Sequence, residues 1–153
     1  MNYDELLIEA DSNNLVTKEK PLKAYNGRIR GRKILIRKDM TETQKGCVLA
    51  EELGHYHTTV GDILDQNISE NRKQERRARL WSYNKLIGLN GIVSAYKAGC
   101  RNTHDVAEHL NVTEEFLQEA LSCYKQKYGI YIRVDNYAIY FEQGISVLEL
   151  IRD

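Results

Sequence analysis

The stretch from Val48 to Gly61 holds two adjacent glutamates followed closely by a histidine. Glu51, Glu52 and His55 take the places of a His-Glu-x-x-His metal motif, with glutamate at the first position. On a helix, residues four apart share one face, so the side chains of Glu51 and His55 can converge on one ion. Glu52 projects about 100° away, beside that ion. The spacing therefore predicts a metal site with a carboxylate next to it.

Such a site has the parts for hydrolysis by a bound metal ion. The metal lowers the pKa of a water bound to it, and a neighbouring carboxylate takes the proton. Glu52 is the candidate general base, and Glu51 and His55 are candidate ligands. A third ligand is required. The candidates are Glu75, on the next predicted helix, and its rivals Asp62, Asp65 and Glu70.

Glutamate at position 51 changes the expected properties of the metal. Carboxylate oxygen is an accepted zinc ligand at ~2.0 to 2.2 Å. Two carboxylates with one histidine nevertheless make the bound water less acidic and favour harder ions. We expect Zn²⁺, because it accepts both ligand types, and another divalent ion such as Mn²⁺ is the alternative because of the two carboxylates. His57 points about 200° away from His55 around the helix, which predicts a surface or capping residue.

The elements that must position these residues follow from hydrophobic spacing and capping signals. A short helix is predicted near Tyr3 and strands between Leu22 and Asp39, punctuated by Asn26-Gly27 and Gly31. Thr41 and Gln44 have capping-box spacing, which predicts a helix running to about His57. A loop over 60–69 and a long helix, starting at Ser69 or Asn71 and ending at Gly88, come next.

The remaining chain predicts a helical tail and a closing hairpin. A short helix is expected over Gly91 to Lys97, followed by two helices between Asn102 and Gly129 with Thr103 and Thr113 as N-caps. Alternating residues around Asp135-Asn136 predict a β-hairpin. The class is α+β, predominantly helical. We expect a single domain over 1–153, with strands and metal-site helices in 1–100 and the helical pair and hairpin in 101–153.

Composition limits the compartment and the partners. The chain has 153 residues with 22 basic and 22 acidic side chains, so no overall field draws it to nucleic acid or membrane. The cysteines Cys47, Cys100 and Cys123 are far apart, form no C-x-x-C pair and are odd in number, which is a poor disulfide framework and indicates a reducing cytoplasm. Neither a secretion signal nor a membrane span is apparent. We expect a cytoplasmic protein.

Two segments raise the question of nucleic acid. From Lys18 to Lys38 there are nine basic residues and one acid, Glu19. We expect these charges to protect solvated edge strands, with contact to nucleic acid as the alternative. From Arg101 to Leu121 the chain has helix-turn-helix cadence but a net charge of minus four, which a phosphate backbone repels. Direct nucleic-acid binding is therefore not expected, and the helical pair is interpreted as packing structure or a protein-binding site.

The order of elements resembles the ImmA/IrrE family of metallopeptidases from phages, mobile elements and their bacterial hosts. The resemblance lies in "AEELGH" on one helix, "ERRARLWSYNKLI" on the next, and the helix-turn-helix-like tail. It implies that Glu51, His55 and Glu75 are the metal ligands and Glu52 the general base. Ala78 and Trp81 complete the pattern after Glu75. Glu51 departs from the family, which has histidine at that position.

The resemblance implies an intracellular zinc-dependent endopeptidase that acts on the repressor protein of a phage or mobile element. Two alternatives remain open. One is a catalytically impaired relative that binds the repressor as an antirepressor without cutting it. The other is a transcription regulator that contacts DNA through residues 18–38.

Restoring the missing histidine tests whether position 51 binds metal. Glu51→His should hold zinc more tightly than the parent, because an imidazole nitrogen binds at ~2.0 to 2.1 Å and one negative charge leaves the site. Glu51→Ala should weaken zinc binding. Side-by-side zinc titrations measure both effects. Equal affinities in the parent and both variants would show that Glu51 is not a ligand.

Overall fold

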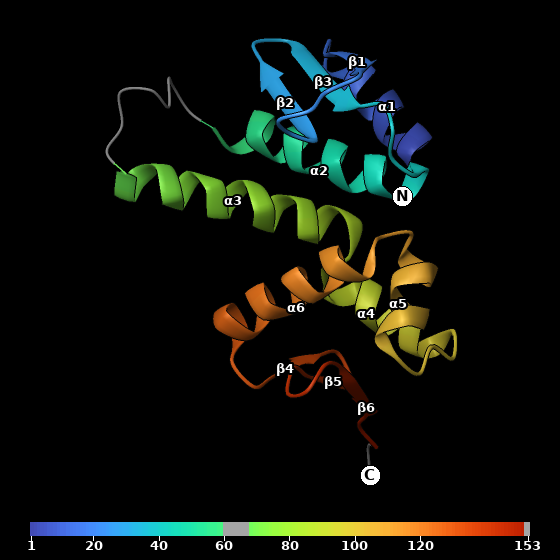
Figure 1. Ribbon diagram of the computed structural model, residues 1–153. Coiled ribbons are helices and arrows are strands. Elements are labelled where there is room, and N and C mark those ends of the chain that lie inside the picture. The colour runs from blue at the N-terminus through green and yellow to red at the C-terminus, as the bar shows by residue number, and fades with distance from the viewer. Residues whose placement is uncertain (60–67, 152–153) are drawn as a thin grey trace. The chain divides into compact units, whose positions relative to one another are not determined.

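The computed structural model describes residues 1–59 and 68–151, with only the backbone for residues 68–70. Most of the predicted loop over 60–69 lies outside the described residues. Contacts divide the chain into two compact units, Met1–Lys85 and Leu86–Asp153. Each unit has its own small sheet and its own helices (Figure 1). The class is α+β and predominantly helical, as predicted.

The first unit begins with a helix and a small mixed sheet. Helix α1 (Tyr3–Ser12) precedes β1 (Val16–Lys20), β2 (Gly27–Arg30) and β3 (Lys33–Arg37), and the strand order is β1-β3-β2. Strand β3 pairs with β1 in parallel and with β2 in antiparallel fashion. Ile34 and Ile36 of β3 are fully buried. One face of the sheet therefore belongs to the core, where β2 and β3 pack on helix α2 (Figure 1).

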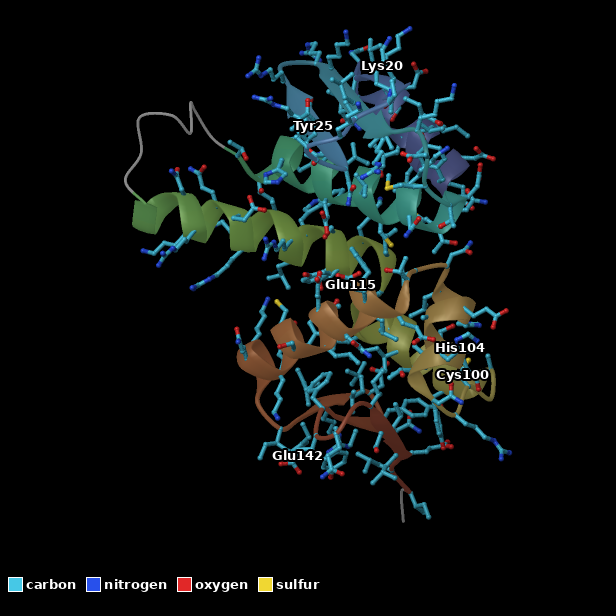
Figure 2. The ribbon with its side chains drawn as sticks, in the orientation of Figure 1. Lys20, Tyr25, Cys100, His104, Glu115 and Glu142 are labelled. Atoms are coloured by element: carbon cyan, nitrogen blue, oxygen red, sulfur yellow. The ribbon has the colours of Figure 1, made fainter. Side chains whose placement is uncertain are left out.

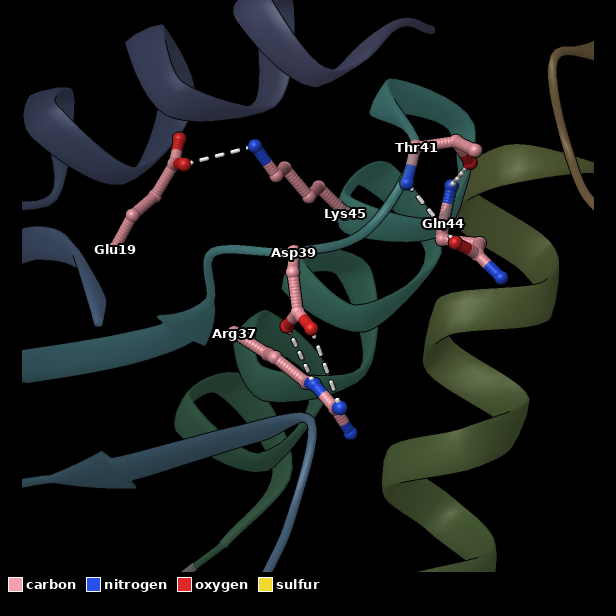
Figure 3. A network of polar contacts seen from close by, with 6 residues as sticks. All are labelled: Glu19, Arg37, Asp39, Thr41, Gln44 and Lys45. Atoms are coloured by element: carbon pink, nitrogen blue, oxygen red, sulfur yellow. Dashed lines mark hydrogen bonds and ion pairs between the residues drawn. The ribbon is translucent and has the colours of Figure 1, made fainter. Parts of the chain in front are cut away.

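Helix α2 (Glu42–Thr58) starts with the predicted capping box. Thr41 Oγ1 accepts a hydrogen bond from the Gln44 amide at 3.1 Å, and Gln44 Oε1 accepts one from the Thr41 amide at 2.9 Å (Figure 3). These two bonds satisfy backbone donors that the first turn of a helix leaves without partners. The beginning of the site helix is thus fixed by local sequence.

Polar contacts tie the sheet to α2 at its edge. Lys45 of α2 lies 2.8 Å from a carboxylate oxygen of Glu19 on β1 (Figure 3). Tyr3 donates a hydrogen bond to the other oxygen of Glu19 at 3.0 Å. The hydrogen bond from Lys45 is the main reason that the pKa of Glu19 is lowered. Glu19 thereby joins α1, β1 and α2.

Helix α3 (Ile68–Leu86) lies beside α2 at a very close crossing (Figure 1). A Cβ atom on Gly54 of α2 would stand 2.3 Å from the backbone oxygen of Ala78 on α3. Ala78 itself is buried. Only glycine at position 54 permits this approach. Near its end α3 is also tied to α1, because Lys85 Nζ lies 2.6 Å from Glu9 Oε1.

The second unit packs three helices against a three-stranded antiparallel sheet. The helices are α4 (Gly88–Lys97), α5 (Thr103–Leu110) and α6 (Glu114–Tyr128), and the strands β4 (Tyr131–Val134), β5 (Tyr137–Tyr140) and β6 (Ser146–Glu149). Its fully buried side chains include Ile92, Leu117, Tyr124 and Ile139. The Tyr124 hydroxyl accepts a hydrogen bond from the Gly88 amide at 3.2 Å, which satisfies a donor in the first turn of α4.

Several details of the predicted elements were wrong. Strand β1 was missed because Val16–Lys20 carries three charged residues and no apolar alternation, and the closing hairpin gains a third strand, β6. The N-cap of α5 is Asn102, whose side chain accepts from the Asp105 amide at 2.8 Å, and not Thr103. The capping role of Thr113 is confirmed. No described helix combines the length and apolarity that a membrane crossing needs.

The close crossing predicts opposite effects of the same substitution at two glycines of α2. Gly54→Ala should destabilise the protein by about 1 to 3 kcal/mol, because its methyl group collides with backbone. Gly46→Ala is the control. Its methyl group would meet no non-local atom closer than 3.7 Å, so the better helix propensity should stabilise by about 1 kcal/mol at most. Denaturant unfolding measures both. A neutral Gly54→Ala would contradict the crossing.

Candidate metal centre

The crossing of α2 and α3 brings the predicted ligands His55 and Glu75 together. His55 lies one residue beyond Gly54, and Glu75 lies nearly one turn before Ala78. His55 Nε2 stands 3.4 Å from Glu75 Oε2. Both side chains are partly exposed, 22% for His55 and 44% for Glu75, so the pair is open to solvent. The structure thus joins two of the residues that sequence reasoning selected.

The spacing of this pair suits two ligands of one metal ion. Two atoms bound ~2.0 to 2.1 Å from a tetrahedral zinc ion lie about 3.3 to 3.4 Å apart. The 3.4 Å between His55 Nε2 and Glu75 Oε2 is close to that value, and the same distance also suits a direct ion pair between the two side chains. An imidazole nitrogen and a carboxylate oxygen are also ligand types that zinc accepts. The pair therefore fits a zinc ion by chemistry and by separation.

Arg79 is a functional neighbour that sequence reasoning missed. Its Nε atom lies 3.5 Å from Glu75 Oε1, four residues further along α3. The signal was present in the sequence, because glutamate four residues before arginine is a favourable helical pair. Arg79 engages the oxygen of Glu75 that faces away from His55. It therefore helps to hold the carboxylate in the orientation that presents Oε2 to the histidine.

Glu52 lies on α2, and its side chain is buried against strand β2. It is 8% exposed, and Ser82 is the other polar side chain among the buried described residues. A Cβ atom on Gly27 of β2 would lie 3.3 Å from Glu52 Oε1 and 2.4 Å from Val48 Cγ1. The backbone of β2 therefore lies directly over this carboxylate, and a side chain at position 27 would collide with Val48 and press on Glu52.

Burial and neighbouring charge alter the acidity of Glu52. Burial is the larger cause and raises its pKa from 4.5 to about 7, with further contributions from the negative charges of Glu51 and Glu75. A buried carboxyl group resists ionisation because the charged form loses its hydration. Near neutral pH this group is thus balanced between accepting and donating a proton, which suits general acid–base chemistry.

Glu51 is half-buried on α2, one turn before His55. Its charge acts on Glu52, so the three carboxyl groups of the site share one neighbourhood. Within residues 1–59 and 68–151, however, no three His, Cys, Asp or Glu side chains stand together as a complete metal-binding group. His55 and Glu75 form the assembled part of the predicted site, and Glu51 remains a predicted ligand.

The structure describes His57, but not the side chains of the rival ligands Asp62, Asp65 and Glu70. Asp62 and Asp65 lie outside the described residues, and so does the side chain of Glu70. His57 is exposed and stacks on Trp81, with ring centroids 4.7 Å apart and planes inclined by 21°. Trp81 is only half-buried. The predicted surface role of His57 therefore includes a stacking contact that links α2 to α3.

Helix α2 carries a buried glutamate, and its histidine faces a glutamate on α3. The family that matches the chain identifies it as a metallopeptidase-type domain. Residues 10–122 match the family model Peptidase_M78, described as the IrrE N-terminal-like domain. The match covers most of the chain, and the protein belongs to this family. No curated protein matches the chain.

The raised pKa of Glu52 predicts a pH-dependent stability. The native state binds the Glu52 proton more tightly than the unfolded chain does. This stabilisation is complete below about pH 4.5, falls as the pH rises, and is lost above about pH 7, a total of roughly 3 kcal/mol at ~1.4 kcal/mol per pKa unit. Glu52→Gln should escape this loss. As the pH rises from about 4.5 to about 7, the free energy of unfolding of Glu52→Gln should therefore increase relative to that of the parent.

Urea unfolding across this pH range, with a chelator present, provides the measurement. Glu115→Gln makes the same chemical change at an exposed carboxylate and serves as the control. It should follow the parent at every pH. Parallel profiles for Glu52→Gln and the parent would contradict the burial of an ionisable group at position 52.

Proposed function

We propose that the protein is an intracellular, metal-dependent endopeptidase, with zinc as the metal. The observation that carries this proposal is the His55–Glu75 pair, whose 3.4 Å separation suits one zinc ion. Membership of the Peptidase_M78 family supports the same reaction class. The buried Glu52 supplies a carboxyl group on the neighbouring face of α2.

Each polar residue of the site has a distinct role in this proposal. His55 and Glu75 hold the ion, with Glu51 as the third ligand, and Arg79 keeps Glu75 in position. When bound, zinc supplies Lewis acidity towards both water and the peptide carbonyl. Mn²⁺ is the alternative ion, because a site with two carboxylates and one imidazole is rich in hard oxygen ligands.

Glu52 handles the proton in this reaction. In its ionised form it accepts a proton from the attacking water, and in its protonated form it returns that proton to the leaving amine. A pKa near the working pH serves both halves of this cycle. Gly27 contributes by leaving room for the carboxyl group beneath β2, where bulk water does not compete for it.

We further propose that the substrate is a repressor-type DNA-binding protein, so that cleavage relieves transcriptional silencing. The support for this substrate is the resemblance to peptidases of phages and mobile elements. A second function uses the same surface without cleavage, namely an antirepressor that only binds the repressor. Glu51 at the first ligand position favours this second function, since it weakens the activation of water.

Zinc titration and proteolysis together test the proposal. The parent should bind one zinc ion and cleave a repressor-type substrate. Glu52→Gln should still bind zinc but lose at least about 100-fold in cleavage rate, because an amide cannot accept the proton. His55→Ala should lose both zinc and cleavage. His109→Ala changes an exposed histidine of the second unit and should preserve both.

Two outcomes would revise the proposal. Tight binding of the repressor without cleavage, at saturating zinc, would favour the antirepressor. Cleavage that survives in Glu52→Gln would place the general base at another residue.

A further inference from the structure

The solvent face of the first sheet gathers basic side chains from all three strands. Successive side chains of a strand point to opposite faces. Ile34 and Ile36 of β3 are buried, so Lys33, Leu35 and Arg37 point outward. Register then assigns the outward neighbours on β1 and β2. We call these outward cations the basic face, and they are Lys18, Lys20, Arg28, Arg30, Lys33 and Arg37.

The cations of the basic face stand in register across the sheet. Lys18, Leu35 and Arg28 form one row, and Val16, Lys33 and Arg30 form the next. Neighbouring rows are about 6.6 to 6.8 Å apart along the strands. The acid of this segment, Glu19, points to the opposite face, where it bonds Lys45 and Tyr3. Figure 2 shows nitrogen-tipped side chains projecting from the sheet near Lys20.

Most of this charge is not neutralised within the described part of the chain. Arg37 pairs with Asp39 at 2.7 Å. For the other five cations no ion pair forms with a described carboxylate. These five are Lys18, Lys20, Arg28, Arg30 and Lys33. Protection of sheet edges can account for the cations of β1 and β2, which are the edge strands, but not for Lys33 on β3, the central strand.

We infer that the basic face binds the phosphate backbone of duplex DNA without reading its sequence. Phosphate contacts need positive charge and no apolar core, whereas the cores of protein interfaces are depleted in lysine. The apolar members of the rows are Val16 and Leu35, and Leu35 is half-buried between its basic neighbours.

The lack of a stacking platform favours duplex over single-stranded nucleic acid. Single strands are held by aromatic side chains on which bases stack. Tyr25 is the aromatic residue beside this face, and Arg28 lies over its ring at 5.6 Å from the centroid. One face of the Tyr25 ring is thus already occupied by a guanidinium group. A duplex presents its phosphates and needs no such platform.

The net charge of the chain did not predict binding to nucleic acid. A formal charge of zero predicts no attraction to nucleic acid by the whole molecule. Within a Debye length, about 8 to 10 Å at physiological ionic strength, the local distribution governs contact instead. The basic face is a separate surface from the His55–Glu75 pair and requires no metal, so it holds independently of the proposed peptidase activity. For an enzyme acting on a DNA-bound repressor, it would add affinity for the place where the substrate is found.

Fluorescence anisotropy with a short DNA duplex of mixed sequence tests the inference on the full chain. Neutralisation of five phosphates predicts that log K falls with log salt concentration with a slope of roughly −4 to −5. Lys18→Gln/Arg30→Gln should reduce this slope by about 1.8 and weaken binding about tenfold or more at low salt. Lys125→Gln/Lys127→Gln removes the same charge from exposed positions on α6 and should bind as the parent does.

The competing surfaces and partners give different results. Equal weakening in both double variants would overturn the inference by showing a net-charge effect. Loss confined to Arg72→Gln/Arg76→Gln would move the contact to exposed cations of α3 and also overturn it. Tighter binding to single-stranded DNA, or to polyglutamate at equal salt, would replace duplex DNA by a different partner. Circular dichroism of each variant confirms that the fold is retained.

Discussion

The backbone contact between Gly54 and Ala78 is the constraint on which the candidate site depends. The carbonyl oxygen of Ala78 occupies the place that a side chain at position 54 would need. Because backbone meets backbone at this point, the two helices approach closely enough for His55 and Glu75 to share an ion. Gly27 of β2 makes a second close contact with α2, in this case with the side chains of Val48 and Glu52. The site helix is thus held between α3 and β2 at two positions without side chains.

The same closeness creates an electrostatic conflict. Glu51, Glu52 and Glu75 would repel one another when all three are ionised, and Glu52 is also removed from water. An apolar residue in place of the buried Glu52 would make the protein more stable. Arg79 offsets part of the conflict from one side by engaging Glu75. A divalent cation held by His55 and Glu75 would offset more of it, which explains why a destabilising arrangement is compatible with the proposed function.

Short-range patterns in the sequence predicted the helix caps and turns, because neighbouring residues determine these features. The capping box at Thr41 and the turn at Asp135 were both predicted from such patterns. Strand β1 was not, because it owes its place to pairing with β3, a partner more than ten residues away. Similarly, the charges of residues 18–38 were evident, but only strand register revealed that most of them share one face.

For the site, spacing on α2 indicated Glu51, Glu52 and His55, but nothing in the spacing could select Glu75 over its rivals. That choice depends on where two helices cross, which the family resemblance supplied and the His55–Glu75 contact supports. The contributions of Arg79 and Gly27 escaped notice for the same reason. Each acts through a neighbour in space, and a residue of this kind has no signature of its own in the sequence.

The C-terminal sheet shows that the boundary of a family and the boundary of a folding unit need not coincide. The family match stops at residue 122, within α6. Beyond it, Tyr124 is fully buried and its ring lies 6.2 Å from that of Phe141, which is also buried. Ile139 completes the same core. A gene fragment cut at the edge of the recognisable homology would divide α6 and leave the hydrophobic side of its helices uncovered. The strands after residue 130 are thus a structural part of the second unit, because they cover apolar side chains of its helices.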